Sequence, residues 1–241
     1  MGSTRELFRE NAYLKECPAT IVAATEEGIE LDQTVFYAEG GGQPGDSGHF
    51  TLPDGGSIAI VSTVRAADGR LLHLTETPAP ALAPGMVVNL QLDWERRHRH
   101  MRMHTCLHLL CALIPAPVTG GALSRDKGRL DFDLDQGLDK EALEAALQRL
   151  IAEDHPVGEQ WITDEDMRSR MDLVRTLAVA PPMGAGRVRL VEIDAVDLQP
   201  CGGTHVARTG EIGNVRLGKI ENKGKHNRRV NVLFRDDMPE A

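Results

Sequence analysis

The sequence has few aromatic residues, few cysteines and no long apolar run. Aromatic side chains make up 4% of its 241 residues, whereas glycine (24) and proline (13) are frequent, so the chain is rich in turns. Four cysteines are too few for a disulfide framework and indicate core thiols or metal ligands in a reducing compartment. The longest apolar run, Leu109–Ile114, is far shorter than the roughly 18 residues of a membrane-spanning helix. No apolar signal segment opens the sequence, and we expect a cytoplasmic protein.

Negative charge is concentrated in one segment. The net charge is −9, and residues 131–172 alone carry thirteen acidic and four basic side chains, so the remaining residues sum to zero. Two stretches are basic on that neutral background: residues 94–103, with a net charge of +3, and residues 214–229, with +5. Local basic patches on an acidic protein indicate an RNA partner held by part of the surface, although two solvated faces would give the same pattern.

Hydrophobic patterning divides the chain near residue 92. Before it, short alternating segments separated by turn residues predict a small antiparallel barrel or sandwich. After it, helices and strands mix: we predict a helix over residues 93–114, strands over 127–134 and 187–193, and helices that begin after N-caps at Asp139 and Thr163. The sequence therefore predicts an α+β protein with a β-rich domain over residues 1–92 and an α+β domain over 93–241.

Two pairs of metal-ligand residues stand out. His104 and His108 are four residues apart in the predicted helix, so both imidazoles project from one face. Cys201 and His205 have the same spacing around two glycines, which allow a tight turn. One sulfur and three nitrogens suit a single tetrahedral zinc ion. Cys106, between the two histidines of the helix, points away from their face, and it is expected to be a core thiol like Cys17 and Cys111.

Other zinc-enzyme and nucleotide-binding motifs are absent from the sequence. Thr105 stands where a zinc protease would have its glutamate, and the HxE and PCxxC motifs of zinc nucleobase deaminases are missing. A glycine-rich segment, residues 38–48, supplies the polar side chains Gln43, Asp46 and Ser47, but it lacks the Lys-Ser/Thr of a phosphate-binding loop. Taken alone, this segment is typical of a hairpin loop. The isolated histidines, His73 among them, are expected to be structural or solvated.

Four motifs in this order resemble a known family. FYAEGGGQPGDSG, HTCLHLL, CGGTH and the following VARTGEIGNVRLGKIENKGKHNRRV are similar to the editing region of alanyl-tRNA synthetases and to the free-standing AlaX trans-editing proteins. The resemblance runs from about residue 19 to residue 235, and we expect a free-standing protein. It implies kinship with the ATP-binding class II synthetases, an N-terminal barrel like those of translation factors, and an editing domain shared with threonyl-tRNA synthetases.

The resemblance also implies roles for particular residues. His104, His108, Cys201 and His205 match the family's zinc ligands, one ion per chain. Gln43 and Asp46 match the glycine-rich motif, which in the family lies beside the editing site. Thr119 falls near a family position that contacts the seryl hydroxyl. The cations expected to contact tRNA phosphates are Arg96, Arg97, Arg99, Arg102, Lys219, Lys223, Lys225, Arg228 and Arg229.

The implied reaction is hydrolysis of the ester that joins serine, and also glycine, to alanine tRNA. Two other hypotheses stay open: a zinc deacylase of this family that acts on another mischarged tRNA, and a non-catalytic tRNA-binding module in which zinc only stabilises the fold. The sequence alone does not distinguish a catalytic from an orienting or a structural zinc.

Overall fold

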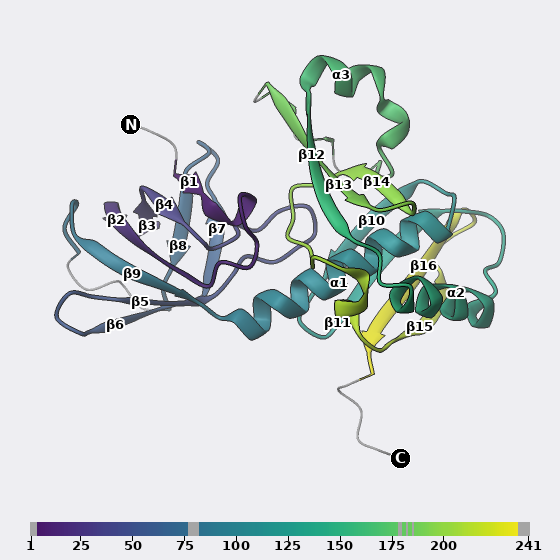
Figure 1. The fold of residues 1–241 in the computed structure, drawn as a ribbon, viewed down its shortest axis with the longest axis horizontal. Helices are drawn as coiled ribbons and strands as arrows, with labels where there is room; N and C mark the ends of the chain where they lie inside the picture. Colours follow the sequence, from purple (N-terminus) through teal and green to yellow (C-terminus); the bar gives the residue numbers. More distant parts are fainter. Residues whose placement is uncertain (1–3, 77–81, 178–179, 182, 185, 236–241) are drawn as a thin grey trace. The chain divides into compact units, whose positions relative to one another are not determined.

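The computed structural model describes residues 4–76, 82–177, 180–181, 183–184 and 186–235. It contains two compact units, one ending at His98 and the other beginning at Arg99. The boundary falls within helix α1 (Trp94–Leu113), a few residues beyond the division that the patterning predicts near residue 92. Helix α1 therefore begins in the first unit and continues into the second (Figure 1).

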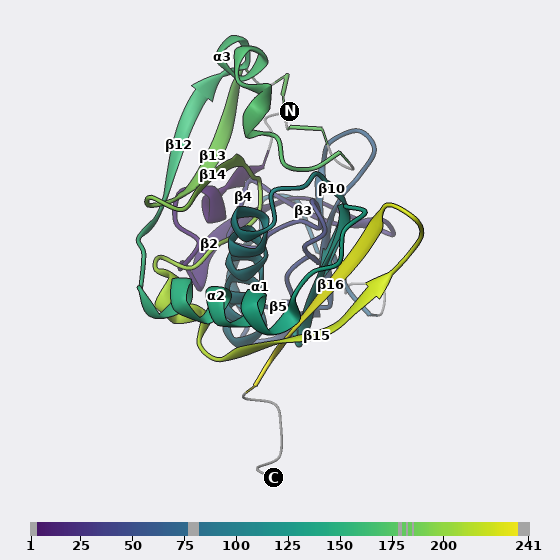
Figure 2. The same cartoon turned by 90° about the vertical axis from the view of Figure 1, so that its right-hand side faces the viewer.

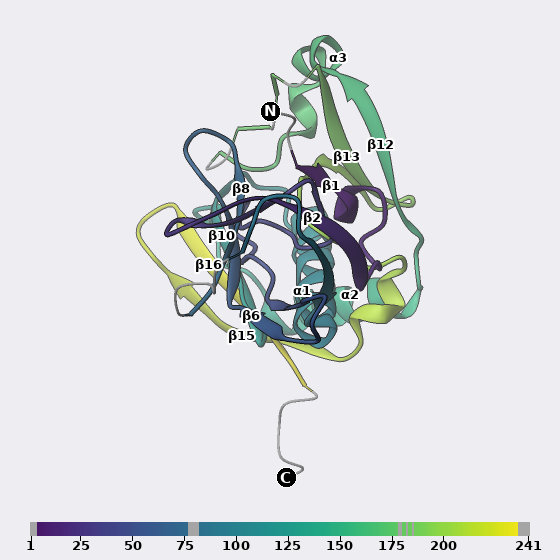
Figure 3. The ribbon, with the colours of Figure 1, turned by 90° about the vertical axis from the view of Figure 1, so that its left-hand side faces the viewer.

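The first unit is built on a seven-stranded sheet with the strand order β6-β5-β9-β2-β3-β8-β7, and Figure 3 shows its strands β2, β6 and β8. A two-stranded parallel pair, β1 (Arg5–Glu6) with β4 (Gln33–Thr34), and the 3-10 helix η1 (Leu7–Arg9) complete the unit. The seven strands are β2 (Glu16–Thr25), β3 (Gly28–Leu31), β5 (Gly48–Thr51), β6 (Ser57–Ile60), β7 (Ser62–Arg65), β8 (Leu71–Leu74) and β9 (Val87–Leu92).

Strand β2 joins two halves of this sheet. Its first part, Glu16–Thr20, pairs with β9, and its second part, Ile21–Thr25, pairs with β3. Among the described residues the end strands β6 and β7 are not paired with each other, so the closed barrel that the resemblance implies is not confirmed. Apolar residues that alternate with polar ones along the strands still form an apolar core, in which Phe36, Phe50 and Leu90 are fully buried.

The second unit combines two antiparallel sheets with helices (Figure 2). The four-stranded sheet has the order β10-β11-β16-β15, and the three-stranded sheet has the order β12-β13-β14. The strands are β10 (Val118–Leu123), β11 (Lys127–Asp133), β12 (Val157–Thr163), β13 (Arg187–Ile193), β14 (Asp197–Pro200), β15 (Val215–Asn222) and β16 (Asn227–Phe234). The helices after α1 are α2 (Lys140–Ala152), α3 (Asp164–Ser169) and the 3-10 helices η2 (Met171–Leu173) and η3 (Thr209–Ile212).

Close packing fixes helix α1 on the four-stranded sheet. A Cβ atom built on Gly128 of β11 would lie 2.7 Å from the sulfur of Met103 and 3.1 Å from a methyl carbon of Leu107. Glycine at this position therefore lets the helix approach the strand. His104 and His108, each one residue further along α1, project about 100° around the helix from these contacts and face another part of the chain.

Caps that the sequence predicts are formed in the structure. The Asp139 side chain accepts hydrogen bonds from the backbone N–H groups of Glu141 and Ala142 at the start of α2. Thr163 and Asp166 form a reciprocal capping box at the start of α3. The α+β class predicted from the patterning is confirmed, since the helices follow a β-rich segment and, apart from the short β1–β4 pair, the strand pairs are antiparallel.

Among the described residues, no helix combines the length and the apolar character that crossing a membrane would need.

Candidate metal centre

Helix α1 presents the first two ligand residues. His104 and His108 are both buried, and their ring centroids are 5.3 Å apart, as expected for an i, i+4 pair on one helix face. Cys106 lies between them on a different face and is fully buried, and burial raises the pKa of its thiol to about 12. Cys17 and Cys111 are also buried free thiols. The prediction that these three cysteines are core residues is confirmed.

The loop after β14 presents the other two candidate ligands, Cys201 and His205. Arg189 of β13 holds this loop: its backbone carbonyl accepts from the N–H of Cys201 at 3.2 Å, and its guanidinium donates to the carbonyl oxygens of Cys201 (3.0 Å) and Gly203 (2.9 Å). Three hydrogen bonds from one residue fix the backbone on both sides of the Cys201 side chain. The loop then returns to α1 at His205.

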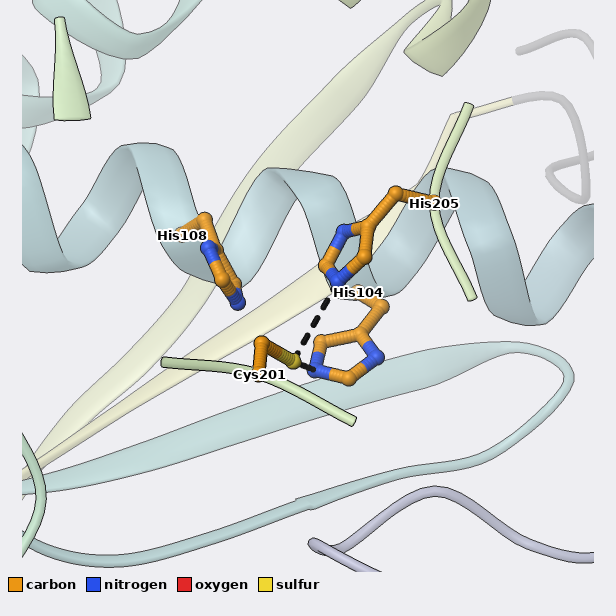
Figure 4. A group of neighbouring side chains, drawn as sticks. All are labelled: His104, His108, Cys201 and His205. Atoms are coloured by element: carbon orange, nitrogen blue, oxygen red, sulfur yellow. Dashed lines mark hydrogen bonds between the residues drawn. The ribbon is translucent and has the colours of Figure 1, made fainter. Parts of the chain in front are cut away.

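The four side chains meet at one point (Figure 4). Their ligand atoms all lie within 4.8 Å of one another. The Cys201 sulfur is 3.5 Å from Nε2 of His104 and 3.3 Å from Nε2 of His205. Zinc bonds of about 2.3 Å to sulfur and about 2.0 Å to nitrogen, at a tetrahedral angle, separate the two ligand atoms by roughly 3.5 Å. The structure thus brings together all four residues that the sequence predicts as ligands, and the distances from the Cys201 sulfur to the two Nε2 atoms fit such an ion.

Thr105 orients His205. Its hydroxyl donates to the carbonyl of Met101 at 3.0 Å, so the contact of 3.1 Å with Nδ1 of His205 is one in which the ring N–H donates. With its proton on Nδ1, the ring directs an unprotonated Nε2 toward Cys201 and the other ligands. This is the usual second-layer support of a metal-bound histidine.

Asp197 occupies the corresponding position behind His108. Its Oδ2 lies 3.6 Å from Nδ1 of His108 and accepts a hydrogen bond of 2.7 Å from the Gln199 amide. Arg175 approaches the other carboxylate oxygen at 3.7 Å. Sequence reasoning missed Thr105, Asp197 and Arg189 as supports of the site, because no ligand-type spacing marks them and their roles depend on β13 and β14 lying next to α1.

The cluster favours a thiolate at Cys201. Burial alone would raise the pKa of this thiol, but the nearby imidazoles of His104 and His205 lower it, and the net pKa is well below the usual value. Thiolate is the form of cysteine that binds metal ions. The donor set is therefore one sulfur anion and three imidazoles.

The glycine-rich loop belongs to the first unit. Gln43 is fully buried, and Asp46 forms a buried ion pair with Arg97 and accepts a hydrogen bond of 2.6 Å from the N–H of Tyr37. Arg97 also donates to the carbonyl oxygens of Ala12 and Val35. These contacts anchor the loop to the start of α1 and to the N-terminal segment.

Thr119 lies on β10, apart from the four ligand residues in its contacts. Its hydroxyl donates to the carbonyl of Asp131 at 3.2 Å and accepts from the amide of Asn227 at 3.3 Å. The preceding residue, Val118, exchanges backbone hydrogen bonds with the segment that contains Arg175. Strand β10 is therefore connected to the metal centre through Arg175 and Asp197.

The four arginines of the first basic patch all donate to groups within the chain. Arg97 is fully buried on Asp46, and Arg96 donates to the carbonyl of Gly45. Arg99 donates to the carbonyl of Arg125 and Arg102 to that of Ile212, and both guanidinium groups lie over the Phe234 ring.

The second basic patch lies on the β15–β16 hairpin. Arg228 is buried and donates to the carbonyl oxygens of Asp135 and Gln136, and Arg229 pairs with Asp131. Lys219, Lys223 and Lys225 are exposed, the second of them within 2.8 Å of Glu221. Of the nine cations predicted to contact tRNA, these three lysines are the ones whose side chains lie open to solvent.

The fold and the four-residue cluster define a class of protein, an α+β protein in which three buried histidines and one half-buried cysteine could hold a metal ion. Within that class, residues 188–231 match the family model described as the threonyl and alanyl tRNA synthetase second additional domain. Residues 7–96 match the model for class II (A) tRNA synthetases. Neither match supports ATP binding by this chain.

Curated relatives identify the family. The chain is 38% identical to the alanyl-tRNA editing protein AlaX-M of Methanosarcina mazei, over 94% of this chain and 95% of that protein. It is 32% identical to AlaX-M of Saccharolobus solfataricus, over 94% of this chain and 97% of that protein. The alanine–tRNA ligase of Pyrococcus abyssi is 35% identical over 92% of this chain, which corresponds to 25% of the ligase. The chain belongs to the AlaX family of alanyl-tRNA editing proteins.

Proposed function

We propose that this protein is a trans-editing hydrolase that removes serine, and also glycine, wrongly attached to alanine tRNA. The observation that carries the proposal is the combination of a match over nearly the whole length of AlaX-M proteins with the four-ligand cluster in the matched region. An apolar pocket built for alanine rejects an added hydroxyl by only about 100-fold, so the synthetase reaction leaves an error that hydrolysis can remove. The expected partner is mischarged alanine tRNA.

We propose that the cluster binds one zinc ion. A thiolate and three imidazoles are a donor set that suits tetrahedral zinc. When bound, such an ion would supply a site of positive charge that orients the acylated end of the tRNA. Thr105 holds the ring of His205, the Asp197 carboxylate lies 3.6 Å from Nδ1 of His108, and Arg189 fixes the backbone around Cys201, so the chain itself supports this site.

Discrimination between serine and alanine is proposed to depend on Thr119. Its hydroxyl donates to Asp131 and accepts one hydrogen bond from Asn227, which leaves a lone pair for the seryl O–H. Bound substrate would shield this exposed acceptor from water, so cognate alanine would leave it unpaired at a cost of about 1–3 kcal/mol. Gln43 and Asp46 are proposed to act beside the editing site as members of the glycine-rich loop.

The assignment of the two domains along the chain is also a proposal. Residues 1–92 would form a domain related to translation-factor barrels, a relation that the sharing of β2 between two half-sheets supports. Residues 93–241 would form the editing domain. Among the predicted tRNA contacts, the exposed Lys219, Lys223 and Lys225 are the best placed to reach phosphates.

The test is the rate of ester hydrolysis by zinc-assayed protein on seryl-tRNA and alanyl-tRNA, both made with alanine tRNA. Fast release of serine with alanine spared is the expected result. Cys201→Ala is the control: a folded, metal-bound but inactive variant indicates a metal role in the reaction, and loss of metal together with folding indicates a structural role. Release of neither amino acid by folded, zinc-loaded protein would refute the proposal and favour another aminoacyl-tRNA or a binding module.

Thr119→Val tests the selectivity step in the same assay. We expect the ratio of kcat/KM for seryl-tRNA to that for alanyl-tRNA to fall about tenfold, because valine keeps the side-chain shape and removes the acceptor. An unchanged ratio would remove Thr119 from the site.

A further inference from the structure

Trp161 is a large aromatic side chain in an exposed setting. It lies on β12, an edge strand of the three-stranded sheet, and 40% of its surface is exposed. The guanidinium carbon of Arg187 is 4.5 Å from the centre of its ring. A single exposed apolar residue needs no special explanation, but an exposed indole stacked with a cation has the composition of a nucleic-acid contact.

The sheet face that carries Trp161 also carries the support of the metal loop. Trp161 pairs directly with Arg189 across the two strands, and residues opposite each other in an antiparallel pair project from the same face. Arg189 donates on its other side to the carbonyl oxygens of Cys201 and Gly203. Trp161 therefore stands about two strand spacings, or roughly 10 Å, from the metal loop.

Part of the opposite face of the same sheet is buried, whereas Gln160 on that face is exposed and donates to Glu192. Val188 and Leu190, which alternate with Arg187 and Arg189 along β13, are fully buried in a cluster with Met167. The face with Trp161 is thus the one on which this sheet offers polar and aromatic groups together. On β12 and β13 this face carries Arg187, the buried Arg189 and Glu159, which pairs with Arg189, and on β14 it carries the buried Asp197.

We propose that Trp161 and Arg187 form a stacking site for an unpaired base at the single-stranded 3′ end of the acylated tRNA. This proposal rests on the proposed function, because it is the editing reaction that requires the acylated ribose to lie at the metal centre. A tRNA end that places its terminal ribose there brings its unpaired bases to the face of β12 and β13. Indole and guanidinium planes stack on any base, and the positive charge of Arg187 complements the adjoining phosphates.

Fluorescence gives a direct readout of this site. The chain has two tryptophans, so the difference in emission between the natural protein and Trp161→Phe reports on Trp161, with Trp94 common to both. The probe is an unacylated RNA minihelix that ends in an unpaired CCA, and a blunt minihelix is its control. We expect the CCA-ended RNA to quench the Trp161 component and the blunt RNA to leave it unchanged. Absence of quenching by the CCA-ended RNA would overturn the proposal.

Steady-state kinetics provide the second readout. Trp161→Ala is expected to raise KM for the mischarged tRNA about tenfold with kcat nearly unchanged, whereas Trp161→Phe, which keeps a stacking ring, stays close to the natural protein. Met171→Ala, at another exposed apolar side chain of the same unit, is the matched control and should alter neither constant. Metal content and circular dichroism establish that each variant is folded. Should Trp161→Ala fail to fold, Arg187→Gln replaces it, with a smaller rise in KM expected.

The two proposals fail in different ways. A protein that edits normally, with no quenching by the CCA-ended RNA and no change in KM for Trp161→Ala, contradicts the stacking site alone. A protein that releases no amino acid but shows the quenching contradicts the proposed reaction and supports the stacking site.

Discussion

His73 is held as a neutral imidazole inside the first unit. Its Nδ1 lies 3.0 Å from the carbonyl of Ile29 and its Nε2 lies 2.8 Å from the hydroxyl of Thr34, while Phe36 and Phe50 pack edge-on against the ring. Complete burial lowers the pKa of this imidazole from 6.5 to about 4. The carbonyl accepts from the protonated Nδ1, and the Thr34 hydroxyl donates to Nε2, so both ring nitrogens are satisfied without a positive charge.

This arrangement predicts an acid-sensitive fold. Between pH 6.5 and pH 4 the unfolded chain binds a proton at His73 and the folded chain does not, so the free energy of unfolding falls as the pH is lowered. The expected contribution is about 1.4 kcal/mol per pH unit. Urea unfolding of the natural protein and of His73→Gln at several pH values in this window measures it, since the candidate metal site and all other groups are common to both. Parallel pH dependences for the two proteins would contradict the assignment.

At this same scale the ligand residues were predictable and their supports were not. The i, i+4 spacing of His104 and His108 requires only a helix, so the sequence pattern suffices. That Asp197 lies behind His108, and that Arg189 holds the loop of Cys201, depends on strands that meet only in the folded chain. No local pattern encodes such contacts.

At the scale of an element, the close packing of the glycine-rich loop allows a prediction about stability. A Cβ atom on Gly45 would lie 2.0 Å from the carbonyl oxygen of Thr63 in β7, and this carbonyl also accepts from the N–H of Glu39. Gly45→Ala must therefore push the loop away from β7, and we expect the free energy of unfolding to fall by about 3 kcal/mol. Chemical denaturation measures this change.

Gly40→Ala is the matched control in the same loop. Its Cβ would meet the Tyr37 hydroxyl at 3.5 Å, an ordinary contact, so the change in unfolding free energy should stay within about 0.5 kcal/mol. Equal effects at Gly40 and Gly45 would show that the approach to Thr63 does not hold the loop.

Elements with local signals were predicted well, and those defined by pairing were not. Asp139 and Thr163 mark the starts of α2 and α3 because a capping side chain acts within one turn of helix. Strand β12 was missed, because five of its seven residues are exposed and little apolar alternation remains to identify it. Its strand conformation comes from its register with β13, which is a tertiary contact.

For the whole molecule, two features could not be predicted from the sequence: the order of the strands in the sheets and the exposure of the charged side chains. Alternating apolar residues select which face of the first sheet is buried, but not whether its end strands meet, so the barrel stayed unconfirmed. Likewise, a run of arginines in the sequence determines the local charge, but not whether each side chain points to solvent or into the protein. Arg97 and Arg228 are buried on partners within the chain, whereas Lys219 and Lys225 face solvent.

A protein with a net charge of −9 can bind a polyanion only through local positive charge, and the exposed cations of the β15–β16 hairpin supply it. Each phosphate contact adds about 0.7–0.9 to the slope of log affinity against log salt concentration. Replacing Lys219, Lys223 and Lys225 by glutamine should therefore lower the magnitude of the slope for tRNA binding by about 2.

The matched control replaces Lys140, Arg149 and Arg168 by glutamine, three exposed cations of the acidic segment, so both variants have a net charge of −12. Because total charge changes equally, only a local contact separates the two, and equal slopes would show that the hairpin lysines do not touch the RNA.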